Sequence, residues 1–256
     1  MRKRFIFDLD GTLVPTQLVY SQAIGEFQLV MLHALGRYAP HIKDIGNQFD
    51  AIDAAMVKME NPRTGQPYGF SVDRFSDAMV RCYEKLCTAQ DRTSDPAVIA
   101  EVQRIAHRVI EPSAYQEVGL VSGATRVLDT LQNRGADLVL LTKHEDATFQ
   151  QEKIEALGLT RWFPEPRIVS EKTVRTFAEL AGPKDAWLNW SIGDSFPSDI
   201  EPALQAGLNA IFIPSPDRWT FERQRESELL QQWGQDRLVC IRDIRELLQQ
   251  KECCRP

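Results

Sequence analysis

The stretch that decides the fold is Phe5-Ile6-Phe7-Asp8-Leu9-Asp10-Gly11-Thr12-Leu13. Its beginning, Phe5 to Phe7, is a continuous aromatic and β-branched run, which is typical of a short buried strand in a parallel sheet. Asp8 and Asp10 are two positions apart, so in an extended chain their side chains point to the same side. The ligand crevice of an open α/β sheet lies beyond the carboxyl ends of its strands. Because two buried carboxylates need a cation, and Mg²⁺ prefers oxygen ligands, we expect a metal there.

The segment after Leu13 changes from a strand pattern to a helical one. Apolar residues recur every three or four positions, which predicts amphipathic helices. The stripes are Tyr20, Ile24, Phe27, Met31 and Leu35; Ile45, Phe49, Ile52, Met56 and Met59; Phe75, Met79, Cys82 and Leu86; and Ile99, Val102, Ile105 and Val109. A polar loop with prolines and glycines, residues 61–69, separates the second stripe from the third. Helices without intervening strands predict a helical bundle, which we place at residues 15–118.

The rest of the chain alternates short apolar runs with helical patterns. Strands are expected at 138–141, 168–169, 187–192, 210–213 and 238–241, and helices at 124–134, after 142, from 172, and at 197–206, 217–232 and 242–250. This alternation is typical of a doubly wound parallel sheet. The predicted fold is therefore an α/β, Rossmann-like core of residues 1–14 and 119–256, with the helical domain inserted after the first strand.

Composition argues against several classes of function. The net charge is −6, and no basic stripe is present to neutralise the phosphates of a nucleic acid. No apolar run approaches the ~20 residues of a membrane span. Acidic residues interrupt the apolar run after the basic N-terminus, which argues against a signal peptide. The 5 cysteines have no recurring metal-ligand spacing, so we expect free thiols and a cytoplasmic protein.

A family resemblance begins with Asp8-Leu9-Asp10-Gly11-Thr12-Leu13, which resembles the first motif of the haloacid dehalogenase-like hydrolases, most of them Mg²⁺-dependent phosphatases. The alternative interpretation of this stretch is an ordinary strand that ends in an Asp-Gly turn. Three later stretches resemble the family's further motifs in the same order: the strand 138–142 ending in Thr, the segment 168–173 with its lysine, and 191–200 with its paired aspartates. With four motifs in order, each at a strand end, the chain is identified as a member of the family.

The resemblance implies a role for each matching residue. Asp8 would be the nucleophile, and Asp10 would be the general acid and base. The phosphoryl group would be bound by Thr142, Lys172 and the backbone at Gly11, and Mg²⁺ would be held by Asp8, Asp10, Asp194 and Asp199. The helical insert would be a cap that closes over the active site.

Two departures from the family's motifs leave questions open. Many relatives have Asn after the Thr of the second motif, where this chain has Lys143. Lys143 could add a cation near the substrate or simply face solvent. Many relatives also have Pro after the motif lysine, where this chain has Thr173. Lys153 is a second candidate for that lysine, but its place on a helix is typical of a solvated face, so we expect Lys172 to fill the role.

The predicted activity is hydrolysis of a small phosphorylated metabolite, as in phosphoglycolate phosphatase-like members of the family. Relatives that act as dehalogenases lack the second aspartate, so Asp10 favours phosphoryl transfer. A sugar phosphomutase and a non-catalytic protein that binds a phosphorylated metabolite remain alternatives. Arg63, in the loop 61–69, could anchor an acidic group of the substrate or belong only to a surface turn.

Overall fold

The structure is a computed structural model that describes residues 2–69, 71–183, 186–215, 228, 232–234 and 236–250. Internal contacts divide the chain into two compact units, Met1–Thr16 with Tyr115–Pro256, and Gln17–Ala114. The sequence predicts domain boundaries after residue 14 and before residue 119. The second unit is thus inserted into the first, directly after the segment that carries Asp8 and Asp10. Its role as a cap stays a prediction.

Strands among the described residues form a parallel six-stranded sheet with the order β3-β2-β1-β4-β5-β6. The strands are β1 (Arg2–Phe7), β2 (Asp137–Lys143), β3 (Arg167–Val169), β4 (Trp187–Gly193), β5 (Asn209–Phe212) and β6 (Leu238–Cys240). β1 lies between β2 and β4, and Phe7 pairs in register with Leu140 and Ile192. Because the strand order reverses at β1, residues that follow β1, β2 and β4 meet at one edge. The predicted α/β, Rossmann-like fold is confirmed.

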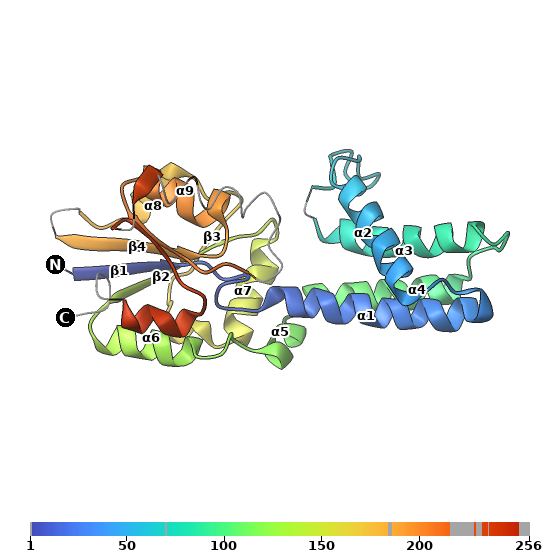
Figure 1. Cartoon of the computed structure of the whole chain (residues 1–256), viewed down its shortest axis with the longest axis horizontal. Coiled ribbons are helices and arrows are strands. Elements are labelled where there is room, and N and C mark those ends of the chain that lie inside the picture. The colour runs from blue at the N-terminus through green and yellow to red at the C-terminus, as the bar shows by residue number, and fades with distance from the viewer. Residues whose placement is uncertain are drawn as a thin grey trace. The chain divides into compact units, whose positions relative to one another are not determined.

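Helices cover both faces of this sheet, with α6 on one face and α8 and α9 on the other (Figure 1). The helices of this unit are α6 (Ala124–Asn133), α7 (Ala147–Ala156), η3 (Leu159–Arg161), α8 (Val174–Leu180), η4 (Phe196–Ile200), α9 (Glu201–Gln205) and η5 (Ile244–Gln249), and α5 (Pro112–Val118) spans the junction with the insert. Ile6 of β1 is fully buried in a cluster with Phe177 of α8 and Ala203 of α9. Packing therefore fixes β1 up to the point where Asp8 begins.

The inserted unit is helical, as predicted, with α1 (Thr16–Leu35), η1 (Gly36–Tyr38), α2 (Ile42–Met56), α3 (Val72–Thr88), α4 (Pro96–His107) and η2 (Arg108–Ile110). Apolar residues spaced by four form the buried stripe of α1, from Val19 to Leu35. The Phe49 and Phe75 rings join α2 to α3, with their centroids 5.6 Å apart. The prediction that Met59 belongs to the stripe of α2 is wrong. The helix ends at Met56, which leaves the Met59 side chain 42% exposed.

Two predicted helices of the core take other forms. Residues 197–206 form the π-helical turn η4 followed by α9, because Pro202 lacks the amide hydrogen that a continuous α-helix needs. The C-terminal segment forms a 3₁₀ helix, η5, rather than an α-helix over 242–250. The helix predicted at 217–232 lies outside the described residues except for 228 and 232, as do Cys253 and Cys254. In the described part of the chain, no helix has both the length and the apolar character needed to cross a membrane.

Candidate active site

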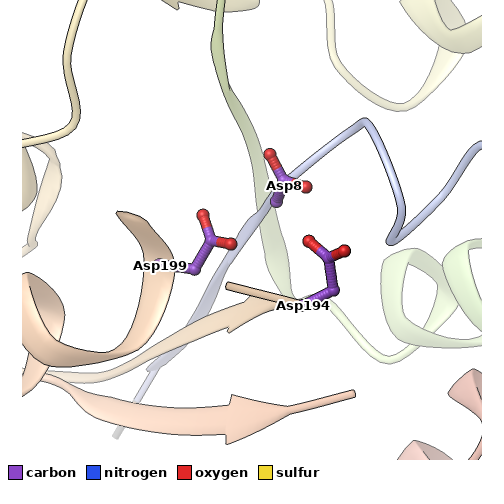
Figure 2. Close-up of side chains that lie close together, drawn as sticks. All are labelled: Asp8, Asp194 and Asp199. Carbon is purple, nitrogen blue, oxygen red and sulfur yellow. The ribbon is translucent and has the colours of Figure 1, made fainter. Parts of the chain in front are cut away.

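Carboxylates from two segments gather beyond the C-terminal ends of β1 and β4 (Figure 2). Asp8 follows β1, Asp194 follows β4, and Asp199 lies in η4, and each offers an oxygen atom within 4.8 Å of the others. The Asp8 amide donates to the Ile192 carbonyl at 2.9 Å, which carries the strand pairing one residue further. Asp8 and Asp199 are buried, and Asp194 is half-buried. Such a set of hard oxygen donors fits a divalent cation such as Mg²⁺.

Glycines allow these carboxylates to approach the backbone. Gly11 has a φ of +85°, and a Cβ atom there would lie 2.2 Å from Oδ2 of Asp194. A Cβ atom at Gly193 would lie 2.3 Å from the Cβ of Asp199. Any side chain at either position would displace a carboxylate of the cluster. The backbone at Gly11 is therefore next to Asp194, and its predicted contact with a phosphoryl group stays a prediction.

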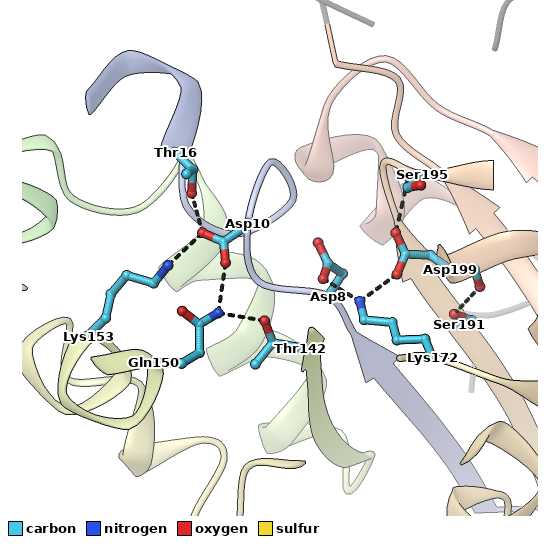
Figure 3. Close-up of polar contacts among 10 residues, drawn as sticks. All are labelled: Asp8, Asp10, Thr16, Thr142, Gln150, Lys153, Lys172, Ser191, Ser195 and Asp199. Carbon is cyan, nitrogen blue, oxygen red and sulfur yellow. Dashed lines mark hydrogen bonds and ion pairs between the residues drawn. The ribbon is translucent and has the colours of Figure 1, made fainter. Parts of the chain in front are cut away.

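Lys172 connects two of the three carboxylates (Figure 3). Its Nζ lies 2.5 Å from Oδ1 of Asp8 and 2.6 Å from Oδ1 of Asp199, and its side chain is buried. A capping box between Thr173 and Thr176 starts α8 directly after Lys172, so the backbone that carries the lysine is fixed. The lysine that the sequence ranks first thus reaches the candidate nucleophile.

Asp199 has a partner on each carboxylate oxygen. Its Oδ1 faces Lys172, and its Oδ2 accepts a hydrogen bond from the Ser195 amide at 3.1 Å. The Ser191 hydroxyl donates to the Asp199 carbonyl at 2.8 Å, which ties η4 to β4. Asp199 is therefore held by Lys172 and the Ser195 amide. The Asp194 carboxylate occupies the space that a Cβ atom at Gly11 would fill.

Burial dominates the charge state of the cluster. Burial raises the pKa of Asp8 to about 7, with the Asp199 and Asp10 charges adding to the rise and Lys172 opposing it. Burial also raises the pKa of Asp194 to about 9, together with repulsion by Asp8 and Asp199. Burial would lower the pKa of Lys172, but Asp199 and Asp8 outweigh it and hold that pKa above its usual range. In their ionised forms the three carboxylates carry more negative charge than the Lys172 ammonium offsets, so a divalent cation would favour those forms.

Asp10 belongs to a second polar network (Figure 3). Its Oδ1 lies 2.7 Å from Nζ of Lys153 and also accepts the Thr16 hydroxyl, and its Oδ2 accepts Nε2 of Gln150 at 2.7 Å. The same Nε2 donates to Oγ1 of Thr142 at 2.7 Å. Burial would raise the pKa of Asp10, but the Lys153 charge and the hydrogen bonds from Lys153, Thr16 and Gln150 hold it below its ordinary value.

The structure thus separates the predicted site residues into two groups. The Asp10 carboxylate is not among the three whose oxygens cluster in the described structure, and its predicted role as a metal ligand stays a prediction. Thr142 is buried at the end of β2 and joins the network of Asp10 through Gln150. Lys143, the next residue, has an exposed side chain. Neither Thr142 nor Asp10 contacts Lys172 in the hydrogen bonds and ion pairs of the described residues.

The prediction that Lys153 lies on a solvated face is wrong. Its side chain is buried, and its ammonium lies 4.5 Å from the centroid of the Tyr115 ring and 5.3 Å from that of Phe149. Gln150 is also fully buried and was missed by the sequence analysis. The one available indication was spacing, because Gln150 and Lys153 continue the apolar stripe of Phe149 and Ile154 on α7.

Arg63, in the loop 61–69 of the helical unit, has carboxylate partners in that unit. Its Nη2 lies 2.8 Å from Oδ2 of Asp77, and its Nε lies 3.2 Å from Oδ2 of Asp73. The Tyr68 hydroxyl, at the end of the same loop, donates to Oδ2 of Asp77 at 2.5 Å. The loop is therefore fastened to α3 by its own side chains.

Comparison with known proteins agrees with the resemblance seen in the sequence. The family model of haloacid dehalogenase-like hydrolases matches residues 3–186. The chain belongs to this family of hydrolases. No protein with a curated function matches the sequence.

Solved structures of this family match nearly the whole chain. A haloacid dehalogenase-like hydrolase from Xanthomonas campestris has a TM-score of 0.63 at 22% identity, over 96% of this chain and 88% of its own. YfnB from Bacillus subtilis, solved bound to magnesium, has a TM-score of 0.58 at 17% identity, over 97% of this chain and 98% of its own. A phosphatase of the family from Thermococcus onnurineus has a TM-score of 0.54 at 16% identity, over 96% of each chain. At these identities, the likeness shows the fold alone.

Proposed function

We propose that the protein is a Mg²⁺-dependent phosphatase that hydrolyses a small organic phosphate monoester through an aspartyl-phosphate on Asp8. The observation that carries this proposal is the separation of two aspartates in one loop. Asp8 faces Lys172 within the carboxylate cluster, whereas Asp10 is held by Lys153 and Gln150. One carboxylate is thus placed as a nucleophile and the other, two residues later, as its acid and base.

The metal site would be formed by Asp8 and Asp194, with Asp199 bracing the site and Asp10 contributing as the family resemblance implies. Bound Mg²⁺ would supply charge that offsets the repulsion between these carboxylates and a phosphate. The fit rests on the donor set, because three carboxylates in their ionised forms carry more charge than one ammonium offsets in a largely buried place. The metal-bound relative from Bacillus subtilis supports the choice of magnesium.

The proposed hydrolysis has two steps, formation of the aspartyl-phosphate and its hydrolysis. In the first, a carboxylate oxygen of Asp8 attacks phosphorus and the ester P–O bond breaks. Asp10, which Lys153 keeps ionised in the free site, would have to be protonated in the substrate complex and would then give that proton to the leaving oxygen. In the second, Asp10 takes a proton from water, the water oxygen attacks phosphorus, and the bond to Asp8 breaks. Inorganic phosphate leaves, and Asp8 and Asp10 return to their starting forms.

The phosphoryl oxygens would be bound by Lys172, Thr142 and backbone amides after Asp8. Oγ1 of Thr142 accepts a hydrogen bond from Gln150, so its own hydrogen can be donated to a phosphoryl oxygen. Lys172 already lies 2.5 Å from Asp8, where it would offset the charge that develops during attack. These positions suit phosphoryl transfer, in which catalysis consists mainly of positioning and charge stabilisation.

The helical unit of residues 17–114 would act as a cap that selects the substrate. The chain leaves the core directly after the segment of Asp8 and Asp10 and returns near Tyr115. This connectivity supports a cap, because the insert is tied at both ends to the core unit. The expectations of a cytoplasmic location and of no nucleic-acid partner stay predictions.

The proposal is tested by phosphate release. The purified protein is given 4-nitrophenyl phosphate and a panel of phosphorylated metabolites, with Mg²⁺ or with EDTA. We expect inorganic phosphate from the ester with Mg²⁺ and none with EDTA, and we expect Asp8→Asn to be inactive. A phosphomutase would instead convert one sugar phosphate into its isomer without net phosphate release. A binding protein would show neither reaction while still being stabilised by a metabolite.

A further inference from the structure

We infer that Lys153 and Gln150 on α7 are positioning residues, which hold the Asp10 carboxylate in the direction that proton transfer to the leaving group requires. This inference rests on the proposed function. It assigns to α7 a task that neither the sequence motifs nor the carboxylate cluster includes. The inference is based on two buried groups, the Lys153 ammonium and the Gln150 amide, each of which binds one oxygen of the Asp10 carboxylate.

The geometry begins at the start of α7. The Asp146 side chain accepts the Phe149 amide at 3.0 Å, which fixes the first turn of the helix. Gln150 and Lys153 are three positions apart, so they project from the same face one turn apart. Both are essentially inaccessible to solvent, at 0% and 1% exposed. The helix therefore presents two polar groups to the interior at a fixed spacing.

The two groups divide the Asp10 carboxylate between them. Lys153 approaches Oδ1 at 2.7 Å, and Gln150 approaches Oδ2 at 2.7 Å. Thr16 adds a hydroxyl to Oδ1. With both oxygens tied, the carboxylate plane cannot turn about its Cβ–Cγ bond without breaking a contact made by α7. The direction of its remaining lone pairs, and hence of a proton on it, is set by this helix.

Asp10 is the polar partner that these two buried side chains share. In the described part of the chain, Asp10 is the carboxylate that forms an ion pair with Lys153. The Nε2 of Gln150 donates hydrogen bonds to Asp10 and Thr142, while its Oε1 has no hydrogen-bond partner in the described structure. Burying an ammonium and an unsatisfied amide oxygen is costly, so a purely structural helix would be served better by apolar residues.

Gln150 also couples the two halves of the proposed chemistry. Its Nε2 touches Asp10, the proposed acid, and Thr142, the proposed phosphoryl ligand. One amide would thus fix the position of the Asp10 carboxylate relative to the Thr142 hydroxyl. Proton transfer is sensitive to such placement, whereas binding of the phosphoryl group by Lys172 is not expected to depend on α7.

The test compares two esters that differ in their need for an acid. 4-Nitrophenolate leaves readily without a proton, and phenolate is more basic and benefits from one. The ratio of kcat/KM for 4-nitrophenyl phosphate to that for phenyl phosphate therefore reports general-acid catalysis. We expect Lys153→Met and Gln150→Met to raise this ratio about tenfold, a part of the 10²–10⁴ that a positioned acid contributes. Lys153→Arg, which keeps the charge, should raise the ratio less than Lys153→Met does.

Controls separate positioning from packing. Ile154→Val shortens a fully buried side chain on the same helix and should lower both rates equally, with the ratio unchanged. Thermal melts establish that each variant is folded. If Lys153→Met does not fold, Gln150→Met carries the test. If neither folds, the two contacts serve the fold and the inference is overturned.

Failure of the proposed phosphatase function can be distinguished from failure of the positioning role of Lys153 and Gln150. If the parent protein releases phosphate from neither ester with Mg²⁺, the proposed function fails and the inference fails with it. If the parent cleaves both esters and Lys153→Met lowers both rates equally, only the inference is overturned. A faster reaction of phenyl phosphate in Lys153→Met would also overturn it, since Lys153 would then hold Asp10 away from the leaving group.

Discussion

Lys172 places its ammonium 2.5 Å from the carboxylate of Asp8, and both side chains are buried. The two residues are 164 positions apart in the sequence and meet because the end of β1 and the start of α8 lie at the same edge of the sheet. A buried ion pair is weak support for stability, yet removing one partner leaves an uncompensated charge. The pair is therefore better understood as a device that keeps Asp8 oriented and its charge offset.

Replacement of Lys172 by Met should damage both activity and folding. We expect kcat/KM for 4-nitrophenyl phosphate to fall at least about 100-fold, because the developing charge loses its stabilising cation. The free energy of unfolding should fall by about 3 kcal/mol, since Asp8 and Asp199 lose their common partner. Phosphate release and urea denaturation measure the two effects. Lys58→Met, at an exposed position of the helical unit, serves as the control and should change neither.

Replacement of Asp8 by Asn should abolish turnover without weakening the fold. The amide cannot form the acyl phosphate, so phosphate release should fall by at least about 10³-fold. The pKa of Asp8 is raised by burial to about 7, so its charge disfavours the folded state at neutral pH. Melting in EDTA at pH 8 should thus occur at the same or a higher temperature in the variant. Activity within tenfold of the parent would contradict the nucleophile assignment.

Stability without metal should fall as pH rises. The folded pKa values of Asp8 and Asp194, about 7 and about 9, lie above the ordinary value of 3.8. Between the ordinary and raised values, the folded state binds more protons than the unfolded state, so the free energy of unfolding decreases with increasing pH. In EDTA, the melting temperature should drop from pH 5 to pH 9, and Mg²⁺ should raise it more at pH 8 than at pH 5.

A matched variant checks the origin of this pH dependence. Asp194→Asn removes the group with the higher pKa, so its melting temperature in EDTA should vary less between pH 7 and pH 9. Its response to Mg²⁺ should also be smaller. A parent protein whose apo melting temperature is constant or rises across this range would contradict the assigned charge states.

The sequence revealed those parts of the fold that have a local pattern. The run Phe5 to Phe7 predicted β1, and the order of later apolar runs predicted a parallel sheet with a helical insert, which the structure confirms. Position near a strand end also pointed to Lys172, because the lysine comes three residues after β3 ends at Val169. These inferences succeed since the period of a strand or helix is written in a few neighbouring residues.

The network around Asp10 had no comparable local pattern. Lys153 was predicted to face solvent because charged residues on helices usually do. Its partner is far away in the sequence, and only the packing of α7 against the core brings the two groups to 2.7 Å. The π-helical turn η4 was also missed, since an Asp within a predicted α-helix does not reveal that the turn is widened around Asp199.

Comparison of Gly11→Ala with Gly135→Ala should separate the clash of a new Cβ atom with Asp194 from the cost of a positive φ. The φ of +85° strains any side chain, and the new Cβ would meet Oδ2 of Asp194 at 2.2 Å. Gly135 has a φ of +75° with nothing within 4 Å, so Gly135→Ala reports the backbone cost alone, about 1 kcal/mol. Gly11→Ala should lose clearly more stability and require more Mg²⁺ for half-maximal activity. Equal effects of the two substitutions on stability and Mg²⁺ requirement would contradict a close approach to Asp194.

Arg63 provides the last prediction, on the loop 61–69 of the helical unit. A substrate anchor needs a guanidinium that is available, but here two carboxylates of α3, Asp73 and Asp77, already engage it. The Arg63 side chain is 53% exposed, so these pairs should contribute only about 0.5–1 kcal/mol to stability. We therefore expect Arg63→Ala to lower the unfolding free energy by that amount. We also expect it to change kcat/KM by the same small factor for 4-nitrophenyl phosphate and for the best metabolite of the panel.

The comparison of 4-nitrophenyl phosphate with the best metabolite decides whether Arg63 anchors the substrate or only holds the loop on α3. An anchor for the substrate would act only on the metabolite, whose distal groups reach beyond the phosphate. A loss of kcat/KM confined to the metabolite would therefore assign Arg63 to recognition and contradict the structural role. Asp77→Asn is the matched variant, because it loosens the same loop while leaving the guanidinium in place. If Asp77→Asn weakens the fold as Arg63→Ala does, with both esters affected equally, the contacts of Arg63 serve to hold the loop on α3.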